Sequence, residues 1–148
     1  MADEERPLNR RGQRAARELG DFLASRGYEP EEVLCSPALR TRETWEGLTA
    51  AVLEVRPVLR MEATLYQASP DTMLDVLKTA TAPVVMMLGH NPGIAEFAAK
   101  LPDRMPTHLD YRRYPTAATA VLDFQIDSWD QLTFGSGALR DFFVPTRS

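Results

Sequence analysis

The stretch that most constrains the fold is Pro83 to Gly93, PVVMMLGHNPG, in which an apolar run ends in a polar turn. Val84 to Leu88 gives five consecutive apolar residues between a proline and a glycine. Such a run is typical of a strand that is buried on both faces inside a parallel sheet. The stretch therefore predicts an α/β protein with this strand near the centre of its sheet.

The turn after this strand carries His90. Asn91 and Pro92 predict an N-cap and a first-turn proline for a helix that runs to about Leu101. His90 would then lie at the carboxyl end of a central strand and beside a helix N-terminus, where open α/β sheets bind anions. The alternative is that these residues make an ordinary turn and that His90 is a surface histidine.

A second strand-to-helix turn repeats this design. Glu32 to Ser36, EVLCS, predicts a short apolar strand, after which Ser36 would cap a helix and Pro37 would occupy its first turn. The helical spacing of several apolar residues predicts the buried face of that helix, namely Leu39, Trp45, Leu48 and Val52.

Arg40 falls in the first turn of this second helix, where the helix dipole disfavours a cation. An anion bound over the helix end would explain its position, because the guanidinium and the free backbone N–H groups would act together. The alternative is a surface arginine paired with Glu43 or Glu46.

The patterns in the rest of the sequence predict further helices and strands that fit one α/β domain over residues 1–148. They predict a helix from an Asn9 N-cap to Gly27, a strand at Val55–Leu59, a loop at Leu65–Ala68, a helix at Pro70–Ala80, a loop with His108 at Pro102–Pro115, and strands at Thr116–Gln125 and Gln131–Gly135. Because only the turn IDSWD separates the last two strands, we expect an antiparallel hairpin at one side of the sheet.

The composition excludes several classes of protein. A net charge of -4 argues against nucleic-acid binding. The single cysteine, Cys35, cannot form an internal disulfide, and with only two histidines in the chain a structural zinc site is disfavoured. The acidic start MADEERP does not match a signal peptide, and no apolar run reaches the length of a membrane span. We therefore expect a cytoplasmic protein with neither nucleic-acid nor membrane partners.

Five motifs, taken in order, resemble the histidine phosphatase superfamily, and the SixA-like phosphohistidine phosphatases within it. They are RPLNRRG at Arg6–Gly12, CSPALRTRET at Cys35–Thr44, LYQA at Leu65–Ala68, GHNP at Gly89–Pro92 and PTAA at Pro115–Ala118. The resemblance implies a three-layer α/β/α, phosphoglycerate mutase-like fold with a mostly parallel sheet and an antiparallel edge. It also implies hydrolysis of phosphohistidine or a small phosphoester through a phosphohistidine intermediate, without a metal ion or cofactor.

The resemblance also assigns site residues. Arg40 matches the arginine of the SPALR segment and His90 matches the second histidine of the family, so both are expected to bind phosphate and to act in catalysis. The expected partner is a phosphorylated protein or a small phosphoester. Glu43 and Asp110 are candidates for a general acid by sequence position only, and the sequence does not define an oligomeric state.

One departure from the family concerns the nucleophile. The family carries it in an Arg-His-Gly or Arg-His-Ala motif at the end of a first strand, upstream of the RPLN segment, whereas only Met1 to Glu5 precede Arg6 here. His108 lies in a late loop and does not match that motif. We therefore expect an N-terminally incomplete domain whose first strand, next to the His90 strand, is missing. The alternative is an inactive phosphate-binding or interaction module.

Two other nucleophiles fit the sequence poorly. A cysteine phosphatase needs five residues between its cysteine and arginine, whereas four separate Cys35 from Arg40 and none is glycine. A serine hydrolase built on Ser36 and His90 would lack the GxSxG elbow.

Overall fold

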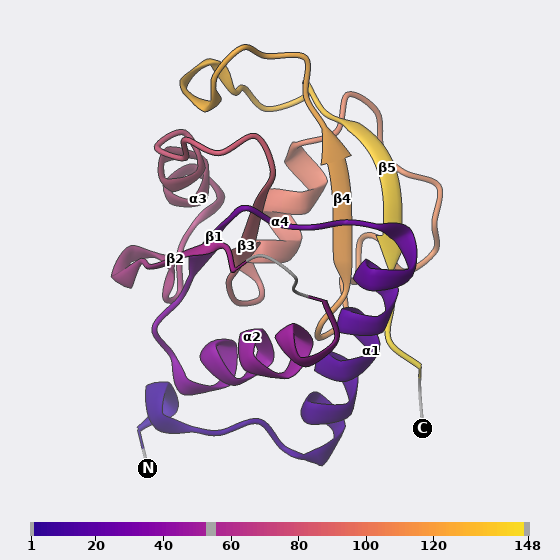
Figure 1. The fold of residues 1–148 in the computed structure, drawn as a ribbon. Helices are drawn as coiled ribbons and strands as arrows, with labels where there is room; N and C mark the ends of the chain where they lie inside the picture. The colour runs from indigo at the N-terminus through magenta and orange to yellow at the C-terminus, as the bar shows by residue number, and fades with distance from the viewer. Residues whose placement is uncertain (1, 53–55, 147–148) are drawn as a thin grey trace.

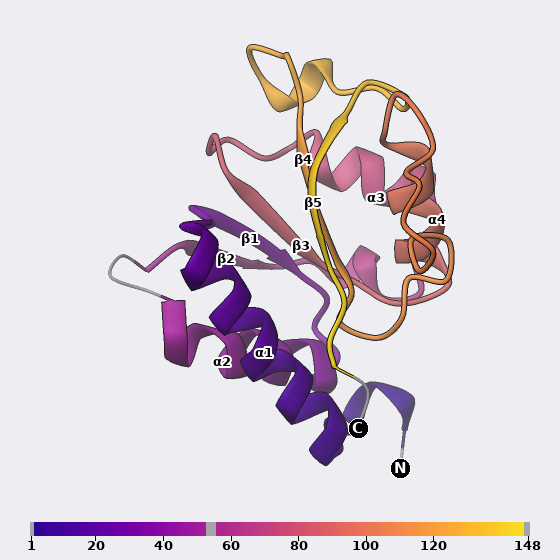
Figure 2. The same ribbon diagram turned by 90° about the vertical axis from the view of Figure 1, so that its right-hand side faces the viewer.

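The computed structural model describes residues 2–52 and 56–146 and has three layers. Helices α1 (Arg10–Arg26) and α2 (Leu39–Val52) cover one face of the strands, and α3 (Pro70–Leu77) and α4 (Gly93–Lys100) cover the other (Figures 1 and 2). The predicted α/β/α arrangement is confirmed. No helix in the described ranges is long and apolar enough to cross a membrane.

The strands form two separate groups. β1 (Glu32–Cys35), β2 (Val58–Met61) and β3 (Val85–Leu88) make a parallel sheet in the order β2-β1-β3. β4 (Thr119–Asp123) and β5 (Ala138–Phe143) make an antiparallel pair with a register shift between Val121 and Leu122. Within the described residues, β3 pairs only with β1 and β4 only with β5, so each of these strands has one edge without a strand beside it.

The helix α1 forms as the sequence predicts. The Asn9 side chain accepts a hydrogen bond from the N–H of Gly12, and Gly27 ends the helix with φ 69°. Gly20 allows α1 to approach α2 closely, because a Cβ there would lie 2.6 Å from the carbonyl oxygen of Leu48. The two helices therefore pack as a close pair on one face of the sheet.

The strand β1 is the central strand of the parallel sheet and is buried along its whole length. Val33 and Cys35 pack in the cluster formed with α1 and α2, whereas Leu34 packs in the cluster formed with α3 and α4. This alternation places apolar side chains in both layers of the core.

The strand β3 differs from its prediction in burial. Its four residues are only partly buried, and the preceding Val84 is 46% exposed. The reason is its position, because β1 covers one edge of β3 while the other edge lines a cavity.

Both predicted helix caps in the strand-to-helix turns are wrong. Helix α4 begins at Gly93 and its N-cap is Pro92, because the Asn91 side chain instead donates to the carbonyl of Tyr114 at 3.1 Å. Helix α2 begins at Leu39, and the hydroxyl oxygen of Ser36 accepts from the N–H of Ala38 at 3.4 Å, before the helix starts. The contact of Asn91 is one that only the folded chain supplies, whereas that of Ser36 is local.

The second strand of the hairpin was also placed wrongly. The chain forms a 3-10 turn at Trp129–Gln131 in place of the predicted strand at residues 131–135, and Gly135 has φ 72°. The Trp129 indole donates to the carbonyl of Ala82 at 2.7 Å, which holds this turn against the core. The strand that pairs with β4 is β5, and the pair is antiparallel as predicted.

Several boundaries differ by a few residues, among them those of β4, which spans Thr119–Asp123 and not Thr116–Gln125. The strand β2 begins at Val58, and Val55 of the predicted strand lies outside the described residues. The helix α3 ends at Leu77 and not at Ala80. Leu65, the first residue of the predicted loop at Leu65–Ala68, is the last residue of a 3-10 turn, Ala63–Leu65.

Candidate phosphate site

The carboxyl ends of β1 and β3 place Ser36 and His90 together. The two strands are in register, with Cys35 opposite Leu88, so the turns that follow them meet at the same edge of the sheet. The Nε2 atom of His90 lies 2.7 Å from the hydroxyl oxygen of Ser36. Both side chains are buried.

Arg40 comes to the same point from the first turn of α2. Its Nη2 atom lies 3.3 Å from Nδ1 of His90, so the structure brings together the two residues that the sequence singled out. Arginine can only donate hydrogen bonds, so Nδ1 of His90 is the acceptor and Nε2 carries the ring proton. That proton is donated to the oxygen of Ser36.

His90 is a neutral imidazole in this arrangement. Burial lowers the pKa of His90 below its ordinary value of 6.5, and the positive charge of Arg40 lowers it further. The negative charge of Asp3 raises the pKa of His90 but is the smallest of the three effects.

The carboxylate of Asp3 occupies the open side of Arg40. Its Oδ2 atom accepts a hydrogen bond from Nη2 of Arg40 at 3.1 Å and another from the hydroxyl of Tyr66. The Nη1 atom of Arg40 donates to the backbone carbonyl of Asp3 at 2.8 Å. The hydrogen bond from Tyr66 is the largest influence on the pKa of Asp3, which is lowered despite some desolvation. Arg40 therefore already holds an oxyanion, supplied by the protein itself.

Tyr66 forms the wall beside His90. The two rings meet edge to face, with centroids 5.4 Å apart and an interplanar angle of 80°. The hydrogen bond to Asp3 is the largest cause that raises the pKa of Tyr66. Its hydroxyl thus remains a protonated donor that points at the anion.

Three contacts at the site were missed in the sequence. Tyr66 lies within the LYQA motif without an assigned role, Asp3 is 37 residues from Arg40 in the sequence, and Ser36 was expected to cap a helix. Glu43, which the sequence suggested as an alternative partner of Arg40, instead accepts a hydrogen bond from the N–H of Leu8 at 2.8 Å. A sequence motif could have indicated Tyr66, whereas the Asp3 contact depends on the path of the chain.

The other candidate residues lie away from this constellation. His108 is exposed in the loop before β4, accepts from the N–H of Asp110 at 3.1 Å and packs against Phe142 with ring centroids 4.8 Å apart. Cys35 is fully buried, and this burial raises the pKa of its thiol to about 11. A cysteine nucleophile is therefore excluded, since the thiol stays protonated near neutral pH.

Ser36 is also unsuited to act as a nucleophile because its side chain is fully buried, despite the short contact with His90. Its contact orients the imidazole. In the part of the chain that the structure describes, no group of three His, Cys, Asp or Glu side chains could hold a metal ion.

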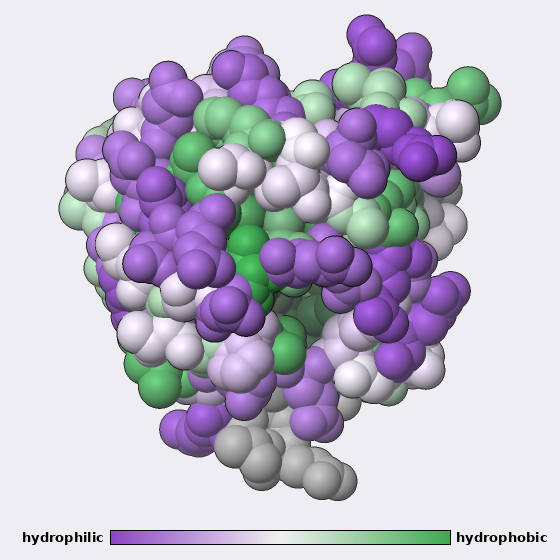
Figure 3. All heavy atoms as spheres, turned by 90° about the horizontal axis from the view of Figure 1, so that it is seen from above, coloured by the Kyte–Doolittle hydropathy of each residue, from purple (hydrophilic) through white to green (hydrophobic). Residues whose placement is uncertain are grey.

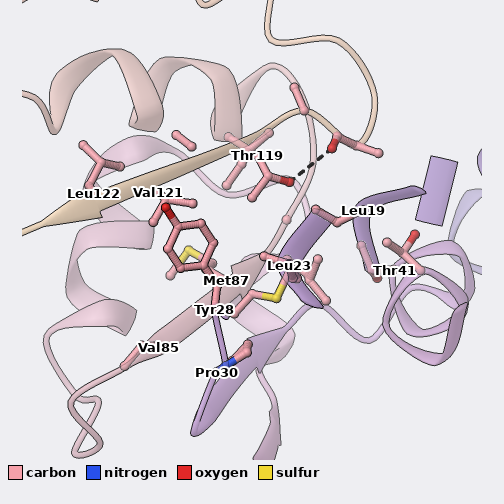
Figure 4. A pocket seen from close by; sticks show the side chains of 18 of the residues that line it. Leu19, Leu23, Tyr28, Pro30, Thr41, Val85, Met87, Thr119, Val121 and Leu122 are labelled. Carbon is pink, nitrogen blue, oxygen red and sulfur yellow. Dashed lines mark hydrogen bonds between the residues drawn. The ribbon is translucent and has the colours of Figure 1, made fainter. Parts of the chain in front are cut away.

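A cavity of about 700 Å³ joins this polar site to the space between β3 and β4. Its walls include Val85 and Met87 on one side and Val121 and Leu122 on the other (Figure 4), and at one end it reaches Arg40 and His90. On the face seen from above, hydrophobic side chains are visible in a recess among hydrophilic ones (Figure 3). The cavity therefore has an apolar part between the two strands and a polar part at Arg40 and His90.

The chain belongs to the histidine phosphatase superfamily, whose branch 1 model matches residues 2–63. Its sequence is 34% identical over 151 residues to protein ML1117 of Mycobacterium leprae, a match that covers 98% of this chain and 90% of that protein. Protein Rv1276c of Mycobacterium tuberculosis is 29% identical over 152 residues, covering 98% of this chain and 92% of the relative.

Within the superfamily the chain is SixA-like. The structure is similar to that of a proposed phosphohistidine phosphatase SixA of Nakamurella multipartitia, with a TM-score of 0.81 and 27% identity, over 99% of this chain and 89% of that one. A second proposed SixA, of Agrobacterium tumefaciens, gives a TM-score of 0.76 and 28% identity over 98% and 87% of the two chains. The predicted phosphoglycerate mutase-like fold is confirmed.

Proposed function

We propose that this protein is a phosphatase that hydrolyses phosphohistidine or a small phosphoester, and that Arg40 and His90 bind the phosphoryl group. The observation that carries the proposal is the guanidinium of Arg40, which lies beside His90 and already holds the carboxylate of Asp3. A site that binds one oxyanion in this way offers the same donors to the oxygens of a phosphoryl group.

Arg40 would be the main donor of hydrogen bonds to the phosphoryl oxygens. Both of its terminal nitrogens face Asp3, one towards the carboxylate and one towards the backbone carbonyl. When a substrate displaces Asp3, these two donors can reach two phosphoryl oxygens at once. Such donors stabilise the charge that spreads over the oxygens in the transition state and hold phosphorus in line for attack.

His90 would act as the second donor. In the free site its Nδ1 atom accepts from Arg40 while Ser36 fixes the orientation of the ring. A dianion in the place of Asp3 favours protonation of the imidazole, which then donates a hydrogen bond from Nδ1. Ser36 is a positioning residue in this scheme, because it acts through His90.

As the family resemblance implies, the phosphoryl acceptor would be a histidine of an Arg-His motif, which neither His90 nor His108 matches. Its ring nitrogen forms a bond to phosphorus while the bond from phosphorus to the leaving group breaks, and the leaving group takes up a proton. Water then attacks phosphorus, the bond to the histidine breaks, and inorganic phosphate leaves with the oxygen of that water. Arg40 and His90 hold the same three oxygens through both steps.

Phosphohistidine is the favoured substrate because two similar structures bear the name of a phosphohistidine phosphatase. The side chains of Arg40 and Asp3 are 26% and 43% exposed, so a phosphorylated side chain on a protein surface could reach Arg40 as well as a small phosphoester. A phosphate-binding module without turnover is the second candidate, because neither histidine of the given chain matches the nucleophile motif.

The decisive experiment is turnover of a phosphohistidine peptide and of an aryl phosphate by the protein in the longest form isolated from its own cells. We expect Arg40→Ala and His90→Ala each to lower turnover by about a hundredfold or more, because each removes a donor from the transferring group. Arg42→Ala is the matched control for the first, since Arg42 lies in the same helix, is exposed and donates to the carbonyl of Pro37. His108→Ala is the control for the second.

Full turnover by either site variant would refute the site assignment. Tight binding of phosphate without turnover of either substrate by the longest form would favour the binding module.

A further inference from the structure

We infer that the outer face of α1 is a docking surface for acidic residues of a phosphorylated protein substrate. This surface, the arginine stripe, consists of Arg10, Arg14 and Arg17, and Arg6 lies between it and the phosphate site. The exposure and the charge of the stripe are independent of catalysis. Only the identity of the docked protein as a substrate rests on the proposed function.

The arginine stripe lies on the solvent side of α1. Arg10, Arg14 and Arg17 are at positions i, i+4 and i+7, so they share one face of the helix. All three are exposed, whereas Leu19 and Leu23 on the opposite face are buried. Seven residues of helix span about 10 Å at 1.5 Å per residue. The stripe therefore presents a row of three cations, about 10 Å long, to the solvent.

This row of cations is unfavourable in the free protein. Like charges three and four residues apart on a helix repel each other. The first turn of α1 contains Arg10 and Arg11 and no acidic residue, although the helix dipole disfavours cations there. Within the described residues, no ion pair joins Arg10 or Arg17 to a carboxylate. A row of carboxylates on a partner would relieve this repulsion, so the stripe favours an anionic partner.

Arg6 connects the stripe to the phosphate site. Its Nη1 atom lies 3.5 Å from Oδ1 of Asp3, whose other carboxylate oxygen bonds to Arg40. The segment between Arg6 and α1 runs along α2 (Figure 1), where the N–H of Leu8 donates to a side chain of α2 at 2.8 Å. The four residues from Arg6 to Arg10 span at most about 14 Å. A protein whose phosphoryl group lies at Arg40 therefore brings its neighbouring residues within reach of the stripe.

Carboxylates at both ends of the stripe limit the length of the partner. Glu4 and Glu5 are exposed just before Arg6, and the exposed Asp21 lies one turn beyond Arg17. A long polyanion such as a nucleic acid would meet these carboxylates, and the net charge of -4 also opposes its binding. A short acidic segment of a protein can pair with the three arginines without reaching them. The observations therefore favour an acidic protein surface.

Phosphohistidine peptides with different flanking charges test the docking surface. In the first peptide, three glutamates begin four residues from the phosphohistidine, on the amino-terminal side in one version and on the carboxyl-terminal side in another. In the second peptide, glutamines replace the glutamates. At about 0.15 M salt, the longest form of the protein should show a kcat/KM about threefold to thirtyfold higher for the glutamate peptide in at least one version, because three exposed ion pairs each contribute a little. This preference should disappear in about 1 M salt, where the Debye length falls from about 8 Å to about 3 Å.

A charge-reversal variant tests the place of docking. Arg10→Glu/Arg14→Glu should lose the preference for the glutamate peptide and should prefer a third peptide with lysines at the same positions. Loss of folding cannot produce such a reversal, and a glutamate at position 10 also complements the helix dipole. Arg104→Glu/Arg113→Glu is the matched control with the same change of net charge. Both of its arginines are exposed in the loop that packs against α4 through Tyr111, so this variant should keep the wild-type preference.

Equal kcat/KM values for the glutamate and glutamine peptides in both versions, or the same loss of preference in both double variants, would overturn the docking surface. Because the peptides would still be hydrolysed, the proposed function would stand. If no peptide is hydrolysed, fluorescence anisotropy with a non-hydrolysable phosphohistidine analogue in the same peptides decides. A binding preference that Arg10→Glu/Arg14→Glu reverses would support the docking surface and count against the proposed function, whereas equal binding would overturn the docking surface.

A nucleic-acid partner is the other outcome that the same variants can detect. A DNA duplex that binds more tightly than the glutamate peptide at about 0.15 M salt, and that loses this affinity in Arg10→Glu/Arg14→Glu, would overturn the acidic protein partner. Weaker binding of the duplex than of the glutamate peptide supports it.

Discussion

Sulfate binding at the phosphate site should depend on the protonation of His90. In the free site the imidazole is neutral, because burial and the charge of Arg40 lower the pKa of His90 below 6.5. Sulfate that displaces the carboxylate of Asp3 replaces a single negative charge by two, and so favours the imidazolium. We therefore expect the pKa of His90 to be higher in the complex than in the free protein, and sulfate binding to take up a proton.

The size of this effect follows from the distances at the site. A ligand oxygen bonded to Arg40 would lie about 4 Å from the ring, since the guanidinium is 3.3 Å from Nδ1 of His90. One added unit charge at that distance is worth about 4 kcal/mol at an effective dielectric constant of about 20, and about 1 kcal/mol in bulk water. Because Arg40 is partly exposed, we expect the added charge to raise the pKa of His90 by an energy between these two figures.

The sign of the pH dependence is fixed by this rise. Sulfate affinity should be highest at a pH below the pKa of His90 in the free protein. It should fall as the pH rises from that pKa to the higher pKa of the complex, and should then stay constant. The total loss should be about tenfold to a thousandfold, and sulfate itself does not titrate in this range. Titration calorimetry from about pH 5 to about pH 8, in buffers of different ionisation enthalpy, measures both the affinity and the proton uptake.

Two variants decide the outcome. His90→Gln should bind sulfate weakly at every pH and take up no proton, whereas His108→Gln should behave as the wild type. An unchanged pH profile in His90→Gln would refute the reasoning, since another group would then carry the proton.

Three further predictions concern other parts of the structure. Asp3→Asn should raise the affinity for sulfate by about twofold to fivefold, because it removes the carboxylate that competes for Arg40, and weaker binding would contradict the displacement model. Glu32→Ala should lower the free energy of unfolding in urea by about 2–4 kcal/mol, because the buried carboxylate accepts from two backbone N–H groups and from Arg60, while Glu32→Gln should lose less. The pKa of Glu32 is lowered, since these contacts outweigh its burial, so the wild-type contribution is present above its ordinary value of 4.5 and lost as the pH falls through the lowered pKa. Cys35→Ser should leave phosphatase turnover of the longest form within about threefold, and an inactive enzyme would reopen the cysteine mechanism.

The elements that the sequence predicted well are those with local signals. Helix α1 has its cap at Asn9 and its stop at Gly27, and the apolar run of β1 is buried on both faces. The second strand of the hairpin could not be located in this way, because Trp129 anchors a turn through a distant carbonyl and Gly135 adopts a left-handed conformation. Neither constraint is visible in a pattern of apolar residues.

The residues of the site also divide into those that a local sequence motif indicates and those that only tertiary contacts define. Arg40 and His90 were found because each lies in a motif at the end of a strand, and parallel strands bring such ends together. Asp3 and Ser36 could not be assigned from the sequence, because their roles depend on tertiary contacts. The charge state of His90 likewise depends on burial and on Arg40, which only the folded chain defines.

The division of the strands into two groups has a consequence for the cooperativity of the native state. Ser36, Arg40 and His90 all belong to the β1–α2–β3 group, and no backbone ladder in the described residues joins β4 and β5 to it, although side-chain contacts such as Arg26 to Asp141 at 2.6 Å do. Amide hydrogen exchange should therefore report two units that open independently, with sulfate slowing exchange in β1 and β3 and leaving β4 and β5 unchanged.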